Sequence, residues 1–312
     1  MHLLVITARY PTPDRPAAGA FIRDRLGDPA LRATVIAPRR YDMPGWRRYL
    51  SIVWRALTAR GGFDGVEGHF VLVSGLIGLM AARLRRLPFV VVAHGSDVRE
   101  TSARSRVHRW LARAVVQGAD AVVANSQSTA ALVEGLGAIP DIVAPGVDLT
   151  RFDVQPRPVD RRVLYLGGAR PLKGVEVARH LADTLVGPGI REVDPSEVPA
   201  LMAEHDVVLV PSQAEGFGVV AAEAIAAGRW VVASAVDGLK EVVIDGVNGT
   251  LVADGDFAGA LQRIPDYDPR TVAASAQRFS LLEHQRRMAA IWSSVVARSA
   301  QGPTTEADSG TQ

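Results

Sequence analysis

The stretch Val207–Gly228, VVLVPSQAEGFGVVAAEAIAAG, decides how this chain folds. Its first four residues form a solid apolar run, which predicts a strand buried in a parallel sheet. The Ala-rich segment from Gly218 to Ala227 predicts a helix that ends at Gly228. A glycine-bearing loop therefore joins the C-terminal end of a strand to the N-terminus of a helix, where open α/β sheets bind their ligands.

Two carboxylates frame this loop. Glu215 lies before the predicted helix, and Glu223 lies on its second turn. Because a helix rises about 1.5 Å per residue, the pair can contact different parts of one ligand about 10 Å long. The free amides at the helix N-terminus favour an anion, above all a phosphate. A nucleotide sugar has these features, with one carboxylate for the hexose and the other for the ribose.

The composition is that of an ordinary globular protein. The 312 residues are 48% hydrophobic and 22% charged, which suits one large domain or two medium ones. We expect no transmembrane helix and no signal peptide, because no apolar run reaches about 18 residues and the N-terminus reads as a strand. The chain has no cysteine, which excludes disulfides and thiolate metal sites and agrees with a cytoplasmic location.

Charge is unevenly distributed along the chain. Residues 1–150 hold 19 Arg and 12 acidic residues, a net charge of +7, whereas residues 151–312 carry a net charge of −5. The basic first half predicts an anionic partner there, either a substrate or a membrane surface. Lysine occurs only at Lys173 and Lys240, so these two positions stand out in a chain that otherwise uses Arg.

Strand and helix patterns alternate, which predicts βαβ units and parallel sheets. A segment with two prolines, 149–162, predicts a linker, after which the alternation restarts. We therefore expect an α/β protein with two Rossmann-like, doubly wound parallel-sheet domains facing a cleft. The predicted strands are 1–7, 33–38, 66–70, 88–93, 120–125, 142–144, 162–167 and 207–210, and the predicted helices include 20–26, 75–86, 104–117, 129–136 and 173–181.

The expected domain boundaries follow from the linker. The N-terminal domain spans residues 1–150 and the C-terminal domain residues 151–275. A helix at 276–298 is expected to pack back on the N-terminal domain. Residues 299–312 are small and polar, and they predict a disordered tail.

Several short motifs occur in a characteristic order. They are Gly19-Ala20-Phe21, Glu67-Gly68-His69-Phe70, His94-Gly95-Ser96-Asp97, Asn125-Ser126, Gly146-Val147-Asp148, Lys173-Gly174, and Glu215-Gly-Phe-Gly to Glu223-Ala. In this order the chain resembles the family-4 glycosyltransferases of the GT-B fold, which belong to glycosyltransferase group 1. The resemblance covers nearly all of residues 1–298, in an unusually short chain.

The resemblance implies a retaining transfer of a hexose-type sugar from a nucleotide-diphosphate sugar, without a metal or other cofactor. The C-terminal domain would bind the donor. The N-terminal domain would bind the acceptor, which would be a natural product, a cell-wall component or a lipid-linked molecule. Two alternatives keep the fold: an epimerase or hydrolase that acts on the nucleotide sugar alone, and a non-catalytic nucleotide-sugar-binding subunit. No nucleic-acid partner is expected.

The resemblance also assigns roles to residues. Glu215 would bind the hexose, Lys173 would neutralise the leaving diphosphate, and His94 would line the reaction centre; these three are the catalytic candidates. Glu223 would bind the ribose diol. The complete donor-binding set is Gly19, Arg170, Lys173, Glu215, Gly216, Phe217, Gly218, Val219 and Glu223. His69 and Asp97 are the candidates for contact with the acceptor, with a structural role as the alternative for each. No metal ligands are expected.

The chain departs from the family pattern in the C-terminal domain. The family has Gly-Arg shortly before the Lys, whereas this chain has Gly167-Gly168, and Arg170 is the candidate replacement. The stretch 179–206 is short, so we expect a pared-down domain there.

Residues 39–55 mix Arg with Tyr and Trp, which is the composition of an interfacial helix. A peripheral contact with the inner face of a membrane is therefore one hypothesis. The alternative, preferred on the sequence alone, is an ordinary surface helix whose Trp and Leu side chains face the core.

Overall fold

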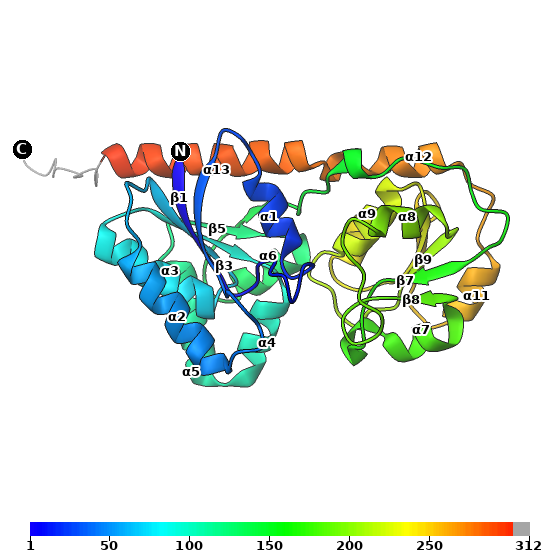
Figure 1. Cartoon of the computed structure of the whole chain (residues 1–312), viewed down its shortest axis with the longest axis horizontal. Helices are drawn as coiled ribbons and strands as arrows, with labels where there is room; N and C mark the ends of the chain where they lie inside the picture. The colour runs from blue at the N-terminus through cyan, green and yellow to red at the C-terminus, as the bar shows by residue number, and fades with distance from the viewer. Residues whose placement is uncertain (302–312) are drawn as a thin grey trace, which may run out of the picture.

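The computed structural model of the chain describes residues 1–301, apart from the side chains of residues 101–104. The predicted tail lies outside the described residues from position 302 onward. The chain forms two α/β domains side by side, and a long C-terminal helix runs back along the first of them (Figure 1).

The N-terminal domain is built on a parallel sheet of six strands in the order β2-β1-β3-β4-β5-β6. Its central strands are apolar on both faces because helices cover both faces. The strands are β1 (His2–Thr7), β2 (Arg32–Ile36), β3 (Gly65–His69), β4 (Phe89–Ala93), β5 (Ala121–Ala124) and β6 (Asp141–Ile142).

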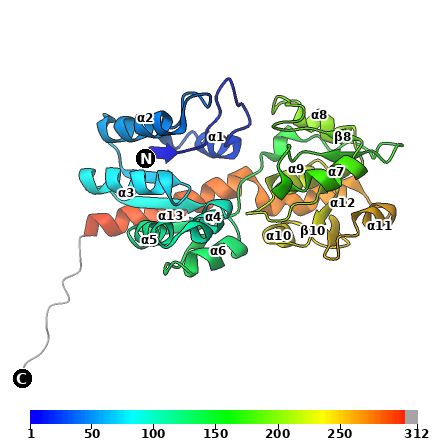
Figure 2. The ribbon, with the colours of Figure 1, turned by 90° about the horizontal axis from the view of Figure 1, so that it is seen from below.

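Helices cover this sheet unequally. One face packs against α2 (Gly45–Thr58), α3 (Val73–Arg85), α5 (Arg106–Gln117) and α6 (Gln127–Glu134). The other face packs against α1 (Ala20–Leu26) and the C-terminal helix α13 (Leu281–Gln301). Figure 2 shows α2, α3 and α5 lying next to one another across the first face.

The C-terminal domain has a parallel sheet of five strands in the order β11-β10-β9-β7-β8. The strands are β7 (Val163–Tyr165), β8 (Thr184–Leu185), β9 (Val207–Val210), β10 (Trp230–Ser234) and β11 (Gly249–Val252). Its helices are α7 (Val175–Leu181), α8 (Val198–Ala203), α9 (Val219–Ala226), α10 (Leu239–Val242), α11 (Phe257–Gln262) and α12 (Pro269–Ala274), with 3₁₀ turns η1 (Leu149–Arg151), η2 (Pro171–Lys173) and η3 (Ser275–Phe279). The predicted class, two parallel-sheet α/β domains, is confirmed.

Some element boundaries differ from the prediction. The helix expected at 104–117 is α5, which begins at Arg106 because the Ser105 side chain caps it by accepting from the His108 amide. A separate helix that was not predicted, α4 (Ser96–Arg104), starts directly after His94-Gly95. Lys173 ends the 3₁₀ turn η2, and α7 begins only at Val175. The short stretch before Asp206 contains the two-residue edge strand β8 and the short helix α8.

The chain crosses between the two domains twice, and the two crossing segments, near Val147 and near Ser280, are hydrogen-bonded to each other. The Val147 amide donates to the Phe279 carbonyl at 2.8 Å, and the Leu281 amide donates to the Val147 carbonyl at 2.8 Å. From there α13 runs along the N-terminal sheet, where Trp292 and Met288 are buried against Leu3 and Val5. The helix extends at least to Gln301, beyond the predicted end at 298. Among the helices of residues 1–301, none has the length and apolar content needed to cross a bilayer.

Candidate functional site

The loop between β9 and α9 brings Glu215 and Lys173 together. Lys173 Nζ lies 2.5 Å from Glu215 Oε2, and Ser212 Oγ donates to the same oxygen at 3.2 Å. The Gln213 amide donates to the Leu172 carbonyl at 2.9 Å, which joins the β9–α9 loop to the turn that carries Lys173. Two candidate catalytic residues from different βα loops therefore form one half-buried ion pair.

A residue of the other domain helps to position Glu215. The Glu215 amide donates to Asp237 Oδ2 at 3.1 Å. The same oxygen lies 2.8 Å from Arg99 Nη2, which comes from α4 of the N-terminal domain. Arg99 and Asp237 were not predicted as site residues. Only their contact across the domain boundary shows that they help to position Glu215.

Gly216 and the His94-Gly95 turn meet at the junction of the two domains. A Cβ atom on Gly216 would lie 2.1 Å from the His94 carbonyl oxygen, and one on Gly95 would lie 2.7 Å from the Gly216 Cα. Asn125 Nδ2 donates to the same His94 carbonyl at 3.2 Å. Only glycine fits at position 216, because any side chain would push the two domains apart.

A second contact joins the domains at the N-terminus of α6. Glu241 accepts hydrogen bonds from the amides of Gln127 at 2.9 Å and Ser128 at 3.2 Å. Ser126 caps the same helix through a hydrogen bond from the Thr129 amide at 3.0 Å, as its sequence position predicts. Glu241 itself was not predicted as a contact, since it comes from a distant part of the chain.

His94 ends a buried chain of polar side chains. His94 Nε2 lies 3.1 Å from His69 Nδ1, and His69 Nε2 lies 2.8 Å from Glu67 Oε1. Arg25 forms a bidentate ion pair with Glu67, and Trp292 Nε1 donates to Glu67 Oε2 at 2.8 Å. The motif that contains Glu67 was recognised in the sequence, but Arg25 and Trp292 were not predicted as its partners; the available signal was a carboxylate within a predicted buried strand.

The hydrogen bonds within this buried polar cluster fix the tautomers of His69 and His94. The ionised Glu67 carboxylate only accepts hydrogen bonds, so His69 must carry its proton on Nε2. His69 Nδ1 is then an acceptor, and His94 must donate from Nε2. The remaining nitrogen, His94 Nδ1, is left as an acceptor, and it has no hydrogen-bond partner among the described residues.

The charges of this cluster follow from burial and pairing. Burial lowers the pKa of His94 well below its usual value, and the neighbouring His69 and Arg9 lower it further. Burial also lowers the pKa of His69, more than the nearby Glu67 raises it. For Glu67, burial raises the pKa, but Arg25 and His69 outweigh it and hold the pKa below the usual range. The cluster is therefore an ion pair with two neutral imidazoles at pH 7.

Asp97 is hydrogen-bonded to backbone amides. Its two carboxylate oxygens accept from the amides of Val71 at 2.7 Å and His94 at 3.0 Å. Burial raises its pKa, against the effect of these hydrogen bonds. This geometry supports the structural alternative for Asp97, which shapes the turn that carries His94.

Glu223 lies on α9 and faces the N-terminal domain. Burial raises the pKa of its carboxyl to about 7, with Arg151 lowering it and Asp24 of α1 raising it. Its side chain is half-buried and makes no hydrogen bond within the described residues. Glu223 is thus a carboxyl group with free acceptor atoms, one and a half turns into the helix that follows Glu215.

The remaining candidates lie around this loop. Phe217 is buried edge-on against Phe279, with the ring centres 5.2 Å apart. Gly218 precedes Val219, the first residue of α9, and Gly19 precedes α1. Arg170 is exposed and precedes the turn that carries Lys173.

Position 168 holds Gly where the family pattern has Arg, and the structure gives a steric reason for it. Gly168 has a φ of +71°, and a Cβ atom there would lie 2.8 Å from the Pro188 carbonyl oxygen. An Arg cannot occupy this position without moving the backbone. A guanidinium in this loop is available only from Arg170, two residues later. Within residues 1–301, no group of three or more His, Asp and Glu residues is placed to hold a metal ion.

Comparisons with known proteins agree with this arrangement. The family described as "Glycosyl transferase 4-like domain" matches residues 1–146, and "Glycosyl transferases group 1" matches residues 146–265. The D-inositol 3-phosphate glycosyltransferase of Geodermatophilus obscurus is 33% identical over 296 aligned positions, which cover 75% of this chain and 64% of the relative. The enzyme of that name from Corynebacterium aurimucosum is 31% identical, covering 70% of this chain and 68% of the relative.

Solved structures show the same fold at low identity. Sucrose-phosphate synthase from Thermosynechococcus elongatus superimposes with a TM-score of 0.74 at 20% identity, covering 95% of this chain and 99% of that one. Anabaena Alr3699/HepE in complex with UDP-glucose gives a TM-score of 0.73 at 19% identity, covering 94% and 100%. The chain spans about two thirds of the length of the two curated relatives. The family models, the relatives and the fold together show that the chain belongs to the family-4-like group 1 glycosyltransferases with the GT-B fold.

Proposed function

We propose that this protein is a retaining glycosyltransferase that moves a hexose-type sugar from a nucleotide-diphosphate sugar to an acceptor hydroxyl. The observation that carries the proposal is the meeting of the Lys173–Glu215 pair with the His94-Gly95 turn at the domain junction. The names of the relatives support it, since they are glycosyltransferases, and one structural neighbour binds UDP-glucose.

The donor is proposed to lie along the β9–α9 loop. Its diphosphate would contact Lys173 and the amides at the start of α9, its hexose would contact Glu215, and its ribose would contact Glu223. Because Lys173 already pairs with Glu215 at 2.5 Å, an incoming diphosphate competes with that carboxylate for the ammonium group. Donor binding would thereby release Glu215 to accept hydrogen bonds from sugar hydroxyls.

The reaction breaks the bond between the anomeric carbon and the phosphate oxygen, and the bonding electrons leave with the nucleoside diphosphate. The acceptor oxygen attacks the same face of the sugar, and its proton passes to the leaving phosphate oxygen. Lys173 stabilises the negative charge that develops on this phosphate, which is the kind of fixed electrostatic contact that contributes most to catalysis.

His94 has a defined part in this scheme. Its free nitrogen Nδ1 is an acceptor, so it would orient a hydroxyl group of the sugar or the acceptor. It would not donate a proton, since burial keeps the imidazole neutral and Nε2 is engaged with His69. His69, a sequence candidate for contact with the acceptor, would act through His94, because it is buried and both of its ring nitrogens are already hydrogen-bonded.

No metal is proposed for this chemistry, because Lys173 would supply the positive charge that a metal ion supplies elsewhere. The test is turnover in the presence of a chelator. Activity that is unchanged by excess EDTA supports a metal-independent reaction, and activity that is lost with EDTA and restored by Mg²⁺ or Mn²⁺ overturns it.

The first experiment identifies the donor by calorimetric titration with UDP, GDP, ADP and dTDP sugars. The best donor is then incubated with acceptors, including inositol phosphate on the precedent of the named relatives, and release of nucleoside diphosphate is measured. The anomeric configuration of the product, read by NMR, tests retention. Equal release of nucleoside diphosphate with and without an acceptor would instead indicate a hydrolase, and binding without turnover would indicate a non-catalytic subunit.

The two lysines provide a matched pair of variants. Lys173→Ala should lower kcat by about 10²–10³, the usual effect of removing one contact to a developing anion. Lys240→Ala changes the same residue type at an exposed position on α10 and should leave kcat unchanged. Equal activities of the two variants would contradict the proposed role of Lys173.

A further inference from the structure

Three adjacent helices, α2, α3 and α5, form one surface of the N-terminal domain, which we call the three-helix face (Figure 2). Their inward side chains pack on the sheet, yet each helix also turns large apolar side chains outward. The exposed fractions are 63% for Trp46 and 67% for Trp54 on α2, and 66% for Trp110 on α5. Leu50 on α2, Met80 and Leu84 on α3, and Val107 on α5 are exposed as well.

This result corrects the preferred sequence interpretation of residues 39–55. Trp46, Leu50 and Trp54 recur every four residues and point to solvent, while Ile52 and Ala56 are the buried residues of α2. The Trp and Leu side chains do not face the core, because the helix packs on the sheet through its opposite side. The other two Trp of the chain, at positions 230 and 292, are fully buried, so the exposed Trp residues all lie on the three-helix face.

The charge of this face has one sign. The sequences of α2, α3 and α5 contain eight Arg residues and no Asp or Glu. Some of these Arg side chains are used within the fold: Arg55 donates to the Ala37 carbonyl at 2.7 Å, and Arg85 donates to the Leu57 carbonyl at 3.0 Å. Arg47, Arg106, Arg109 and Arg113 are exposed and form no hydrogen bond or ion pair through their side chains within the described residues.

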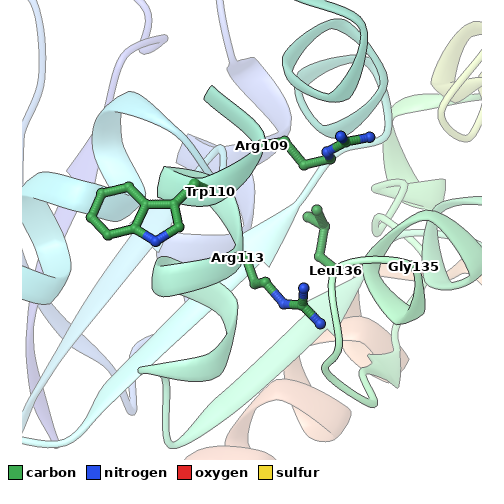
Figure 3. A pocket seen from close by; sticks show the side chains of 5 residues that line it. All are labelled: Arg109, Trp110, Arg113, Gly135 and Leu136. Carbon is green, nitrogen blue, oxygen red and sulfur yellow. The ribbon is translucent and has the colours of Figure 1, made fainter. Parts of the chain in front are cut away.

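A hollow adjoins the same face. It has a volume of about 340 Å³ and lies between α5 and the end of α6. Figure 3 shows the side chains of Arg109 and Arg113 reaching toward Leu136, with Trp110 turned to the other side of α5. Two guanidinium groups beside a small apolar surface can bind one phosphate group with its adjoining alkyl chain.

We propose that the three-helix face docks on an anionic lipid bilayer. Trp side chains favour the headgroup region of a bilayer because they are apolar with one polar edge, and exposed Arg side chains pair with lipid phosphates. The absence of acidic residues from the three helices removes the repulsion that a negative surface would otherwise meet. The hollow beside Arg109 and Arg113 takes one lipid phosphate.

Charge also argues against a second copy of the chain as the occupant. In a symmetric dimer the same face would meet itself, so exposed Arg would oppose exposed Arg without an acidic partner on either side. A bilayer supplies the missing negative charge and an apolar layer at the depth of the Trp rings. The proposal goes beyond the transfer reaction and does not depend on it.

The test is binding to lipid vesicles, read by co-sedimentation and by Trp fluorescence. The purified protein is mixed with phosphatidylcholine vesicles that either contain one third phosphatidylglycerol or lack it. We expect binding only to the anionic vesicles, with a blue shift of Trp emission and with release at about 0.5 M NaCl, where screening is strong. Protein that stays in the supernatant with anionic vesicles at low salt overturns the proposal.

A matched pair of triple variants locates the surface. Arg47→Glu, Arg106→Glu and Arg109→Glu together should weaken partition to anionic vesicles by about 100-fold or more, at about fivefold for each Arg removed. The control is Arg161→Glu, Arg162→Glu and Arg191→Glu, which makes the same charge change at exposed positions of the C-terminal domain. Equal losses in both variants would mean that net charge, not this face, drives binding, and would overturn the proposal.

The apolar part has its own control. Trp54→Ser with Trp110→Ser should reduce both vesicle binding and the blue shift, whereas Val159→Ser with Leu282→Ser removes two exposed apolar side chains elsewhere and should change neither. Sedimentation of the lipid-free protein at rising concentration completes the test. A dimer that disappears in the Trp54→Ser, Trp110→Ser variant would assign the face to self-association and overturn the proposal.

Discussion

The polar residues near the carboxyl ends of the strands differ between the two domains in burial and in hydrogen bonding. In the N-terminal domain, Glu67 and His69 are buried, and each polar side-chain atom has a partner. In the C-terminal domain, Lys173 and Glu215 are half-buried and share one ion pair, and Glu223 has no hydrogen-bond partner within the described residues. The first cluster has little freedom to change, whereas the second has charge and acceptor atoms to offer.

The difference separates positioning from binding. A buried network whose central members, Glu67 and His69, are fully hydrogen-bonded keeps one arrangement, because leaving either of them unpaired costs its desolvation energy. A half-buried pair can exchange partners with a charged ligand at much lower cost. Substitutions in the N-terminal cluster should therefore affect stability first, and substitutions in the C-terminal loop should affect activity first.

The largest effect expected is on activity in the C-terminal loop. Glu215→Ala removes both the proposed sugar contact and the partner of Lys173, so we expect kcat/KM to fall by about 10³, or about 4 kcal/mol. The melting temperature should stay close to that of the wild type. Glu204→Ala, an exposed carboxylate in the same domain, is the control, and activity within a few-fold of wild type in Glu215→Ala would refute the assignment.

The second prediction concerns stability in the N-terminal cluster. Glu67→Gln leaves the buried Arg25 without its counter-charge, which should cost about 3–5 kcal/mol of unfolding free energy in a urea titration. The double variant Arg25→Met, Glu67→Gln removes both charges and keeps an amide oxygen that can accept a hydrogen bond from His69 or Trp292, so it should recover part of that loss. If Glu67→Gln unfolds at the same urea concentration as the wild type, the cluster is not the rigid element described above.

The third prediction uses pH to test Glu223. Its pKa is about 7 in the folded protein and about 4.5 when unfolded. The folded state thus binds more protons between pH 4.5 and 7, so this group favours folding at low pH and disfavours it as pH rises through 7. Because the side chain is half-buried, Glu223→Gln should stabilise the protein by about 1 kcal/mol at pH 8, with little effect at pH 4.5. A stability gain that does not depend on pH would contradict this explanation.

A second variant at position 223 tests the ribose contact. Glu223→Ala should weaken donor binding in calorimetry while leaving kcat at saturating donor nearly unchanged, if the carboxyl group binds the ribose and not the reacting centre. An unchanged donor Kd would exclude that role.

The smallest effect is expected where the domains touch. Arg99 and Asp237 form a partly exposed ion pair across the boundary, so Arg99→Ala should cost less than about 1 kcal/mol of stability. The same change leaves the Glu215 amide with its bond to Asp237, and donor Kd should rise only a few-fold. A loss of activity as large as that of Glu215→Ala would mean that this contact is part of the reaction centre.

Local sequence signals were sufficient for the fold. The apolar run Val207–Val210 and the glycines after it gave a strand, a loop and a helix, because periodicity and chain geometry determine those elements without distant contacts. The resemblance to the family-4 glycosyltransferases, not the local pattern, assigned Glu215 and Lys173 to one donor site, and the structure pairs them.

Contacts between distant segments were not predictable in the same way. Arg25 and Trp292 reach Glu67 from opposite ends of the chain, and Glu241 reaches α6 from the other domain. The local sequence around Arg25, Trp292 and Glu241 does not indicate which distant residue each of them contacts. The outward orientation of Trp46 and Trp54 was missed for a related reason, since an amphipathic pattern does not by itself say which of two apolar stripes meets the sheet.

The C-terminal helix α13 determines when the N-terminal domain can finish folding during synthesis. Leu3 and Val5 leave the ribosome before the C-terminal domain is made, but two residues that cover them, Met288 and Trp292, are made only after it. The first domain therefore stays incomplete, with one side of its sheet uncovered, until the second domain has been made. A nascent chain that stops before position 281 would expose that apolar side of the sheet to chaperones and proteases, so the folded state of the first domain depends on the 21 residues of α13.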